Sequence, residues 1–313
     1  MPLPEGGPAA REASRAELLK LAPQESDAKS RSWITRGANL VVTVSEVEPG
    51  ATLARENNAD EYMVILVPGC AATIRAGKEE IAAVDDSLTI MPPGPSSVTA
   101  RSKGMIIRLL TAKAEDLVAK SWNKAVYADG APEVPALKPW PDPLDGFRLR
   151  HYPLAPYYKP NGERIQPRVF RCTTLMANLV GPFYTRRDVT KLSPHWHEDY
   201  EQVSLALAGR WEHYLRWPRV SNFYDWRDEE HLVLESPSVT IIPATVEHTS
   251  LDTGPVGGGL ALLYDLFAPP RADFSGKPGF VLNEKDYPLP DLTGVRNTTG
   301  GTLLGWQKPR GAA

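Results

Sequence analysis

Residues 195–209 read HWHEDYEQVSLALAG, and this stretch decides how the second half of the chain is interpreted. Two histidines stand two positions apart, at His195 and His197, and a carboxylate follows at Glu201. On an extended strand, side chains two residues apart project to the same face. All three positions are odd, so the pattern predicts that both imidazoles and the carboxylate face one interior. First-row divalent metals accept such ligands, whereas an isolated surface His-x-His is the alternative interpretation.

A third histidine follows in the stretch PATVEH, residues 243–248. The preceding run SVTII, residues 238–242, is apolar and β-branched, which favours a strand. The turn that begins at Pro243 would reverse the chain and return His248 to the end where His195 and His197 lie. This third element favours a metal site over a surface pair of histidines.

The rest of the sequence predicts a chain of short strands. Among 313 residues there are 30 prolines and 24 glycines, which divide the sequence into short apolar runs. Two cysteines, Cys70 and Cys172, exclude a disulfide framework and a zinc site built from cysteine. The chain is long enough for two domains of ordinary size.

Charge and hydropathy make several classes of partner unexpected. The formal net charge is −3, and no helix-turn-helix pattern with a basic face occurs, so no nucleic acid is expected. No apolar run approaches the ~20 residues of a membrane span, and the N-terminus lacks the apolar core of a signal peptide. We therefore expect no membrane partner and a cytoplasmic location.

The two halves of the chain share two stretches in the same order. EYMVILVPG at 61–69 matches EQVSLALAG at 201–209 with an offset of 140, and SLTIMP at 87–92 matches SVTIIP at 238–243 with an offset of 151. An insertion of 11 residues in the second copy explains the difference, and residues 216–231 are the place for it. The pattern predicts an internal duplication; chance similarity between short apolar strands is the alternative.

These motifs resemble those of the cupin superfamily, whose first motif contains H-x-H, a glutamate and a glycine and whose second contains a proline, a glycine and a histidine. The sequence departs from the family pattern in turns: Gly209 comes one residue late, Thr245 replaces a glycine, Ser236 replaces another, and Leu251 stands at an asparagine position. The resemblance spans residues 33–101 and 168–267.

The resemblance implies an all-β chain of two tandem cupin barrels, each a double-stranded β-helix or jelly roll. It also implies that His195, His197, Glu201 and His248 bind one divalent metal ion; iron or manganese is favoured, and zinc or nickel also fits. The predicted organisation is an N-terminal arm at 1–32, a first barrel at 33–130, a Pro-rich linker at 131–160, a second barrel at 161–268 and a tail at 269–313.

The first barrel lacks the equivalent histidines. The two offsets place Arg55, Asn57 and Ser97 where the second barrel has its histidines, and only Glu61 keeps its type. Arginine and asparagine do not replace imidazole ligands, so the first barrel is predicted to be a metal-free scaffold or dimerisation unit. Arg55 either forms a buried ion pair with Glu61 or points to solvent.

Three side chains near the metal motif are candidate catalytic residues. His213 shares a strand face with Trp211, where it can act as an acid or base or can be a core histidine. Arg186, with its neighbour Arg187, can clamp a substrate carboxylate or lie in solvent. Tyr200 lies next to Glu201.

Three functions are compatible with this pattern. The first is a non-haem dioxygenase that acts on a small organic acid or an aromatic or enol compound. The predicted ligand set resembles that of dioxygenases in the cupin superfamily. The second is a metal-dependent isomerase or lyase that acts on a sugar or keto acid. The third is a bicupin that binds or senses a small molecule without turnover. The expected partners are an anionic small molecule and a second copy of the chain in a homodimer.

Overall fold

The computed structural model describes residues 11–158, 168–253 and 260–292. In this part of the chain the regular structure is almost entirely β, and the only α-helices are the short α1 (Glu115–Lys120) and α2 (Ala272–Ser275). The prediction of an all-β chain is confirmed. None of the helices in the described ranges is long and apolar enough to cross a membrane.

The first barrel consists of a seven-stranded and a four-stranded antiparallel sheet. The larger sheet has the order β12-β9-β6-β11-β4-β3-β2 and the smaller β5-β10-β7-β8. Its strands are β2 (Glu25–Ser26), β3 (Ser30–Arg36), β4 (Leu40–Val47), β5 (Thr52–Asn58), β6 (Tyr62–Leu66), β7 (Ala72–Ala76), β8 (Glu79–Ala83), β9 (Ser87–Met91), β10 (Gly94–Ala100), β11 (Gly104–Thr111) and β12 (Arg150–Pro153).

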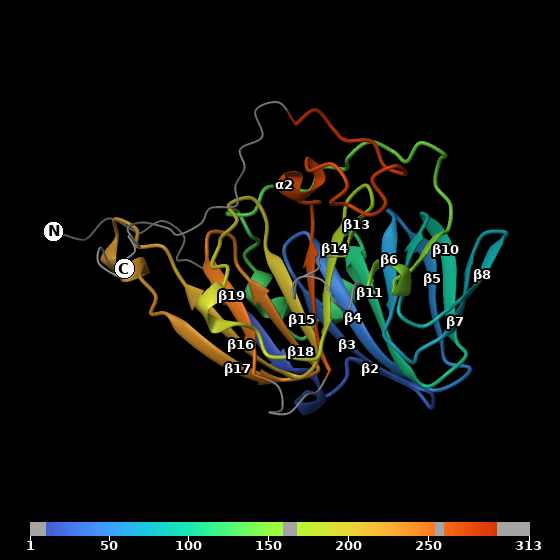
Figure 1. The fold of residues 1–313 in the computed structure, drawn as a ribbon, viewed down its shortest axis with the longest axis horizontal. Helices are drawn as coiled ribbons and strands as arrows, with labels where there is room; N and C mark the ends of the chain where they lie inside the picture. The colour runs from blue at the N-terminus through green and yellow to red at the C-terminus, as the bar shows by residue number, and fades with distance from the viewer. Residues whose placement is uncertain (1–10, 159–167, 254–259, 293–313) are drawn as a thin grey trace.

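The second barrel repeats this plan. Its six-stranded sheet has the order β1-β18-β15-β20-β14-β13, and its three-stranded sheet has the order β17-β16-β19. The strands are β1 (Ser14–Glu17), β13 (Val169–Arg171), β14 (Met176–Phe183), β15 (Gln202–Ala208), β16 (Arg210–Arg216), β17 (Glu230–Glu235), β18 (Ser238–Ile242), β19 (Glu247–Asp252) and β20 (Ala261–Phe267). Figure 1 shows the two barrels side by side, with their larger sheets facing each other in the middle.

The register of the strands confirms the predicted duplication. In the first barrel Leu66 pairs with Ser87, and in the second Ala206 pairs with Ser238. The two pairs are related by the same offsets, 140 and 151, that align the sequence. The extra residues of the second copy lie between β16 and β17 and include the 3₁₀-helix Phe223–Asp225.

Each barrel receives a strand from the segment that precedes the other barrel. Strand β1, which comes before the first barrel, pairs with β18 of the second, and β12, which comes before the second barrel, pairs with β9 of the first. A leucine follows each strand, Leu18 and Leu154, and both are buried in the shared core. The exchange joins the barrels through main-chain hydrogen bonds.

The core between the barrels is continuous. The largest apolar cluster combines residues from both large sheets, such as Ile107 and Leu109 of β11 with Leu205 of β15 and Leu266 of β20. A second cluster fills the interior of the first barrel and includes Ile106 and other inward residues. At ~25 cal/mol per Å² of buried apolar surface, such a shared core disfavours separation of the barrels.

Several segments differ from their predicted organisation. The predicted N-terminal arm contains β1, which pairs with the edge strand β18 of the second barrel. The predicted linker contains β12. The end of the predicted first barrel is helical, with α1 followed by the 3₁₀-helix Lys124–Tyr127. The described part of the tail packs over the barrels and contains α2.

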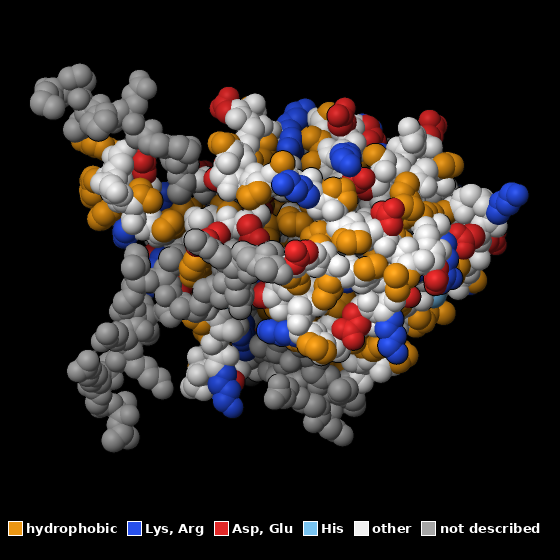
Figure 2. Space-filling model, turned by 90° about the horizontal axis from the view of Figure 1, so that it is seen from above, with side chains coloured by type: hydrophobic (Ala, Val, Ile, Leu, Met, Phe, Trp, Pro, Cys, Tyr) orange, Lys and Arg blue, Asp and Glu red, His pale blue; other side chains and the backbone are white. Residues whose placement is uncertain are grey.

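The surface carries charges of both signs. On the face shown in Figure 2, Lys and Arg side chains alternate with Asp and Glu, and apolar side chains lie between them. The part of this face formed by described residues has no gathered basic patch, in line with the net charge of −3.

Candidate metal centre

Three histidines meet at one end of the second barrel. His195 lies in the long connection between β14 and β15, and an isolated antiparallel bridge joins its backbone to His248 of β19. The two hydrogen bonds of this bridge are 3.0 and 2.8 Å long. Together with His197, the two histidines offer imidazole nitrogens that all lie within 4.8 Å of one another. The prediction that these three histidines come together agrees with this geometry.

The δ nitrogens of the three imidazoles are engaged away from the centre. Nδ1 of His195 lies 2.9 Å from the carbonyl of Ser193, and Nδ1 of His248 lies 2.9 Å from the carbonyl of Val246. Nδ1 of His197 lies 3.1 Å from the hydroxyl of Tyr200. Such partners fix the ring orientation and leave Nε2 for a metal ion.

The fourth group at the centre is Gln202, the first residue of β15. Its Oε1 lies 3.2 Å from Nε2 of His197 and 3.2 Å from Nε2 of His248. Its amide nitrogen donates a 2.9 Å hydrogen bond to Asp265, which directs Oε1 toward the histidines. The ligand set predicted from the sequence did not include Gln202, which directly follows the glutamate that was chosen.

Glu201 does not reach the histidines, which corrects the predicted ligand set. Its carboxylate accepts a 2.6 Å hydrogen bond from the backbone of Ala38 and a 3.0 Å hydrogen bond from Tyr127, both in the first half of the chain. The parity argument fails because residues 197–201 are not a strand and contain a bend at 198–199. The bend shifts the inward position by one residue, from 201 to 202.

Glu61 occupies the same place in the first barrel. Its carboxylate accepts hydrogen bonds from the backbone and hydroxyl of Thr173, at 3.1 and 3.0 Å, and from Tyr287 at 2.8 Å. Each glutamate thus reaches a loop of the other barrel and a tyrosine that follows a barrel. We call these two groups the glutamate clasps, and they explain why both copies keep this glutamate. The predicted pair of Arg55 with Glu61 is not formed.

The donor set fits a cation. A carbonyl only accepts hydrogen bonds, so Nδ1 of His195 and of His248 carries the proton. Burial lowers the pKa of His248 well below its usual value, so the ring is neutral and its Nε2 is an acceptor. Nε2 of His248 and Oε1 of Gln202 are therefore two acceptors directed at each other, an arrangement that a cation between them relieves. Imidazole nitrogen and amide oxygen both suit first-row divalent ions.

A cavity of about 240 Å³ opens beside the centre. Two guanidinium groups line it: Arg187, which donates to the carbonyl of Ser250 at 2.6 Å, and Arg271, which forms two hydrogen bonds with Asp273 at 3.0 and 2.6 Å. Two carboxylates, Asp252 and Asp265, also line the cavity. Most of the remaining wall is apolar and is formed by Val180, Phe183, Trp211, Leu263, Phe274 and Phe280. Arg271, Phe274 and Phe280 belong to the predicted tail, where no sequence motif indicated that they would line a cavity.

The three predicted catalytic side chains do not line this cavity. Arg186 is exposed and donates to the carbonyl of Thr253 at 3.2 Å, so the neighbouring Arg187 takes the predicted inward position. The Tyr200 ring stacks on His197 with centroids 4.6 Å apart, which makes it a positioning residue. His213 is buried, and neither ring nitrogen has a hydrogen-bond partner among the described residues. Burial lowers its pKa to about 4.

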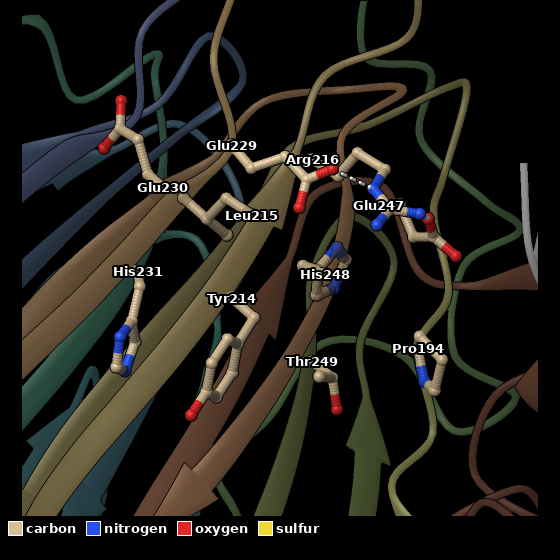
Figure 3. A pocket seen from close by; sticks show the side chains of 10 residues that line it. All are labelled: Pro194, Tyr214, Leu215, Arg216, Glu229, Glu230, His231, Glu247, His248 and Thr249. Carbon is tan, nitrogen blue, oxygen red and sulfur yellow. Dashed lines mark hydrogen bonds and ion pairs between the residues drawn. The ribbon is translucent and has the colours of Figure 1, made fainter.

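A second hollow, of about 320 Å³, lies over strands β16, β17 and β19, on the outer side of the same histidine strand. Figure 3 shows its polar side chains, with Arg216 linked to Glu229. That contact is 2.7 Å long, and Arg216 also lies 3.7 Å from Glu247. His231 stacks on Tyr214. In this hollow one arginine, Arg216, thus faces two glutamates, Glu229 and Glu247.

The architecture and the site place this chain among the two-barrel cupins in fold. Oxalate decarboxylase from Lactobacillus farciminis, solved as a formate complex, superposes with a TM-score of 0.56 at 13% identity, over 85% of this chain and 88% of that one. A point mutant of Bacillus subtilis oxalate decarboxylase superposes with a TM-score of 0.54 at 14% identity, over 85% and 78%.

At such low identity the likeness shows the fold alone. Another structure of the Bacillus subtilis enzyme, with a TM-score of 0.53 at 14% identity, is described by its Mn(II) centres. No protein-family model matches the sequence, and no curated protein is significantly similar to it.

Proposed function

We propose that this chain is a metal-dependent cupin enzyme that binds a small organic carboxylate at the His195, His197, His248 and Gln202 centre. The observation that carries the proposal is the convergence of the imidazole nitrogens and Oε1 of Gln202 beside a cavity with two guanidinium groups. A divalent ion bound there would supply Lewis-acid or redox chemistry.

The charge of the site supports an anionic substrate. Four neutral ligands leave the full charge of a divalent ion uncompensated, whereas a glutamate ligand would reduce it by one. Arg187 places a guanidinium group in the cavity wall, and such groups bind carboxylates through paired hydrogen bonds. Arg271 is already held by Asp273, and Asp252 and Asp265 line the same cavity, so the positive charge of the site comes mainly from the bound ion. Oε1 of Gln202 and the imidazoles together favour iron or manganese over softer ions.

The cavity wall favours an oxygenase over an isomerase. The apolar wall would exclude water from a reactive intermediate. An isomerase needs a side chain that moves a proton at the substrate, but His213 and Tyr200 lie outside the cavity. Asn178 also lines the cavity, and its Oδ1 has no hydrogen-bond partner among the described residues. It would accept a hydrogen bond from a substrate that carries a hydroxyl or amino group, as hydroxy acids and phenolic acids do.

A lyase is the second candidate, because the superposed structures are decarboxylases. In that case the metal centre would promote cleavage of a carbon–carbon bond with release of carbon dioxide and no net uptake of dioxygen. A bicupin that binds its ligand without turnover is the remaining alternative.

The test begins with the metal content of the purified protein, measured by inorganic mass spectrometry. We expect about one equivalent of iron or manganese per chain, lost in His197→Ala and retained in the matched control His231→Ala, whose ring lies at the surface. Absence of metal after reconstitution with either ion would refute the proposal.

Turnover then separates the two candidates. The metal-loaded protein is screened with aliphatic and phenolic carboxylates in an oxygen electrode, and in parallel without dioxygen. Dioxygen uptake that requires the substrate and is absent in His197→Ala supports the oxygenase. Anaerobic release of carbon dioxide supports the lyase instead. A bound carboxylate that is not converted would leave a binding protein.

A further inference from the structure

Arg108 is a charged residue in the interior of the first barrel. It lies on β11 between two inward-facing residues, Ile106 and Leu110, which belong to the apolar cluster that fills this barrel. Its side chain is 3% exposed. Across the sheet it pairs with Thr43 of β4 and with Val64 of β6. A guanidinium group therefore stands in the middle of an otherwise apolar barrel.

The hydrogen-bonding capacity of this guanidinium is mostly unused. Nε of Arg108 donates a 3.2 Å hydrogen bond to Thr43. In the described ranges no other side chain or carbonyl accepts from it, and no carboxylate forms an ion pair with it. An arginine carries five N–H donors and stays protonated in proteins. Four donors and one positive charge thus remain without a partner among the residues that the structure describes.

The nearest charged groups do not neutralise Arg108. Burial, the largest effect, lowers the pKa of Arg108; Tyr62, Glu25 and Asp116 raise it, and the neighbouring Arg55 lowers it. Arg55 itself is held by Asp116 through two hydrogen bonds of 2.6 and 2.9 Å. Glu25 is likewise held by Lys120 at 2.7 Å. Each of the two carboxylates is thus paired with another cation, and Arg108 remains as an excess positive charge. An uncompensated buried charge is costly unless a counter-ion joins it.

Arg108 occupies the position in the first barrel that corresponds to Asp265, next to the metal centre, in the second barrel. Arg108 pairs with Val64, and Asp265 pairs with Ser204, which is 140 residues after Val64. Tyr62 stands where the second barrel has Gln202, and its hydroxyl lies 2.9 Å from the hydroxyl of Ser96. The second barrel thus gathers acceptors, whereas the first gathers donors at the same level.

We propose that the interior of the first barrel binds a small carboxylate anion against Arg108, with the hydrogen-bonded hydroxyl pair of Tyr62 and Ser96 as one further donor. The planar guanidinium presents parallel N–H groups that match the two oxygens of a carboxylate. The duplicated fold then carries a cation site in one barrel and an anion site in the other.

The experiment measures thermal unfolding of the metal-stripped protein in the His197→Ala background, so that the metal centre cannot contribute. Sodium formate is titrated against sodium chloride at constant ionic strength. A ligand that binds only the folded state raises the melting temperature with its concentration. We expect formate to raise the melting temperature and chloride to leave it unchanged. An equal response to both salts, or none to formate, overturns the proposal.

Two variants assign the effect to Arg108. Arg108→Met should abolish the response to formate, and the matched control Arg75→Met should keep it, because Arg75 is an exposed residue of the same barrel paired with Glu80. A full response in Arg108→Met refutes the assignment. If that variant does not fold, Arg108→Lys replaces it, since lysine cannot form the paired bonds. Its dissociation constant for formate should then rise about tenfold, and an unchanged constant also refutes the assignment.

Discussion

At the scale of single residues, the neighbours Glu201 and Gln202 divide two tasks between them. Oε1 of Gln202 points to the histidines, whereas the Glu201 carboxylate accepts a hydrogen bond from Ala38 of the first barrel. Sequence patterns could not separate them, because both residues follow the histidines at a spacing that suits a ligand. The side on which each one falls depends on the bend at residues 198–199.

The first prediction tests these two roles with one variant for each residue. Gln202→Ala should weaken metal binding roughly 10–100-fold, because it removes an oxygen from the centre. Glu201→Gln should leave the metal content unchanged and lower the free energy of unfolding by about 1–3 kcal/mol, because a charge-assisted hydrogen bond to Ala38 is weakened. Titration with manganese and urea denaturation measure the two effects. Loss of metal in Glu201→Gln with full affinity in Gln202→Ala would show that Glu201 is the ligand.

The histidines were predictable at this scale for a physical reason. His195 and His197 lie two residues apart in the sequence, and Pro243 announces the turn that returns His248 to them. Arg271 was not predictable, because it reaches the cavity from beyond the last barrel strand, by contacts far apart in the sequence.

At the scale of secondary-structure elements, the turn between β18 and β19 positions His248. Thr245 in this turn has φ of +69°, a region that a β-branched residue adopts at a cost, and the bend brings its backbone N–H to the carbonyl of His197. The departure from the cupin glycine at this position is therefore a source of strain.

The second prediction follows from that strain. Thr245→Gly should raise the free energy of unfolding by about 1 kcal/mol, because glycine adopts positive φ without a steric penalty. Metal content should stay the same, since the hydrogen bond to His197 is made by the backbone. Chemical denaturation of the metal-free protein is the measurement, with Thr249→Gly in the adjacent strand as a control that should lose stability. A destabilised Thr245→Gly would mean that the side chain makes a stabilising contact that outweighs the strain.

Which strands exist was largely predictable from the sequence, whereas their partners were not. The runs SLTIM and SVTII are strands because they are short, β-branched and bounded by turn residues. Nothing in residues 14–17 indicates that they pair with a strand more than 200 positions away, since edge pairing uses main-chain groups that every sequence has.

At the scale of the whole molecule, the glutamate clasps and the exchanged strands make the two barrels one unit. Glu61 is buried, and burial raises its pKa above the usual value while Thr173 and Tyr287 offset part of this effect. The folded protein therefore binds this proton more tightly than the unfolded chain. The contribution of Glu61 to stability is complete below a pH of about 4.5 and declines as the pH rises through the folded pKa.

The third prediction uses this pH dependence. The free energy of unfolding of the native protein, minus that of Glu61→Gln, should decrease as the pH rises from about 4 to 7. Glutamine cannot ionise and has nearly the same shape. Its single oxygen can still accept from Thr173, and its NH2 group then faces the Tyr287 hydroxyl, a change that does not depend on pH, so the subtraction isolates one titration. Urea denaturation at several pH values gives the difference. A constant difference over this range would show that the Glu61 carboxyl does not titrate differently in the two states.

The reciprocal glutamate clasps resemble the interface of a symmetric homodimer, and this has a consequence for how the two barrels can mutate. When residue i of one subunit contacts residue j of the other and j contacts i in return, the interface is isologous, and two identical subunits can form it. Glu61 with Tyr287 and Glu201 with Tyr127 reproduce that relation inside one polypeptide. A homodimer must alter both of its centres with every mutation. In a tandem fusion, each centre can mutate while the other keeps its sequence, and this chain has kept its histidines in one barrel and placed an arginine inside the other.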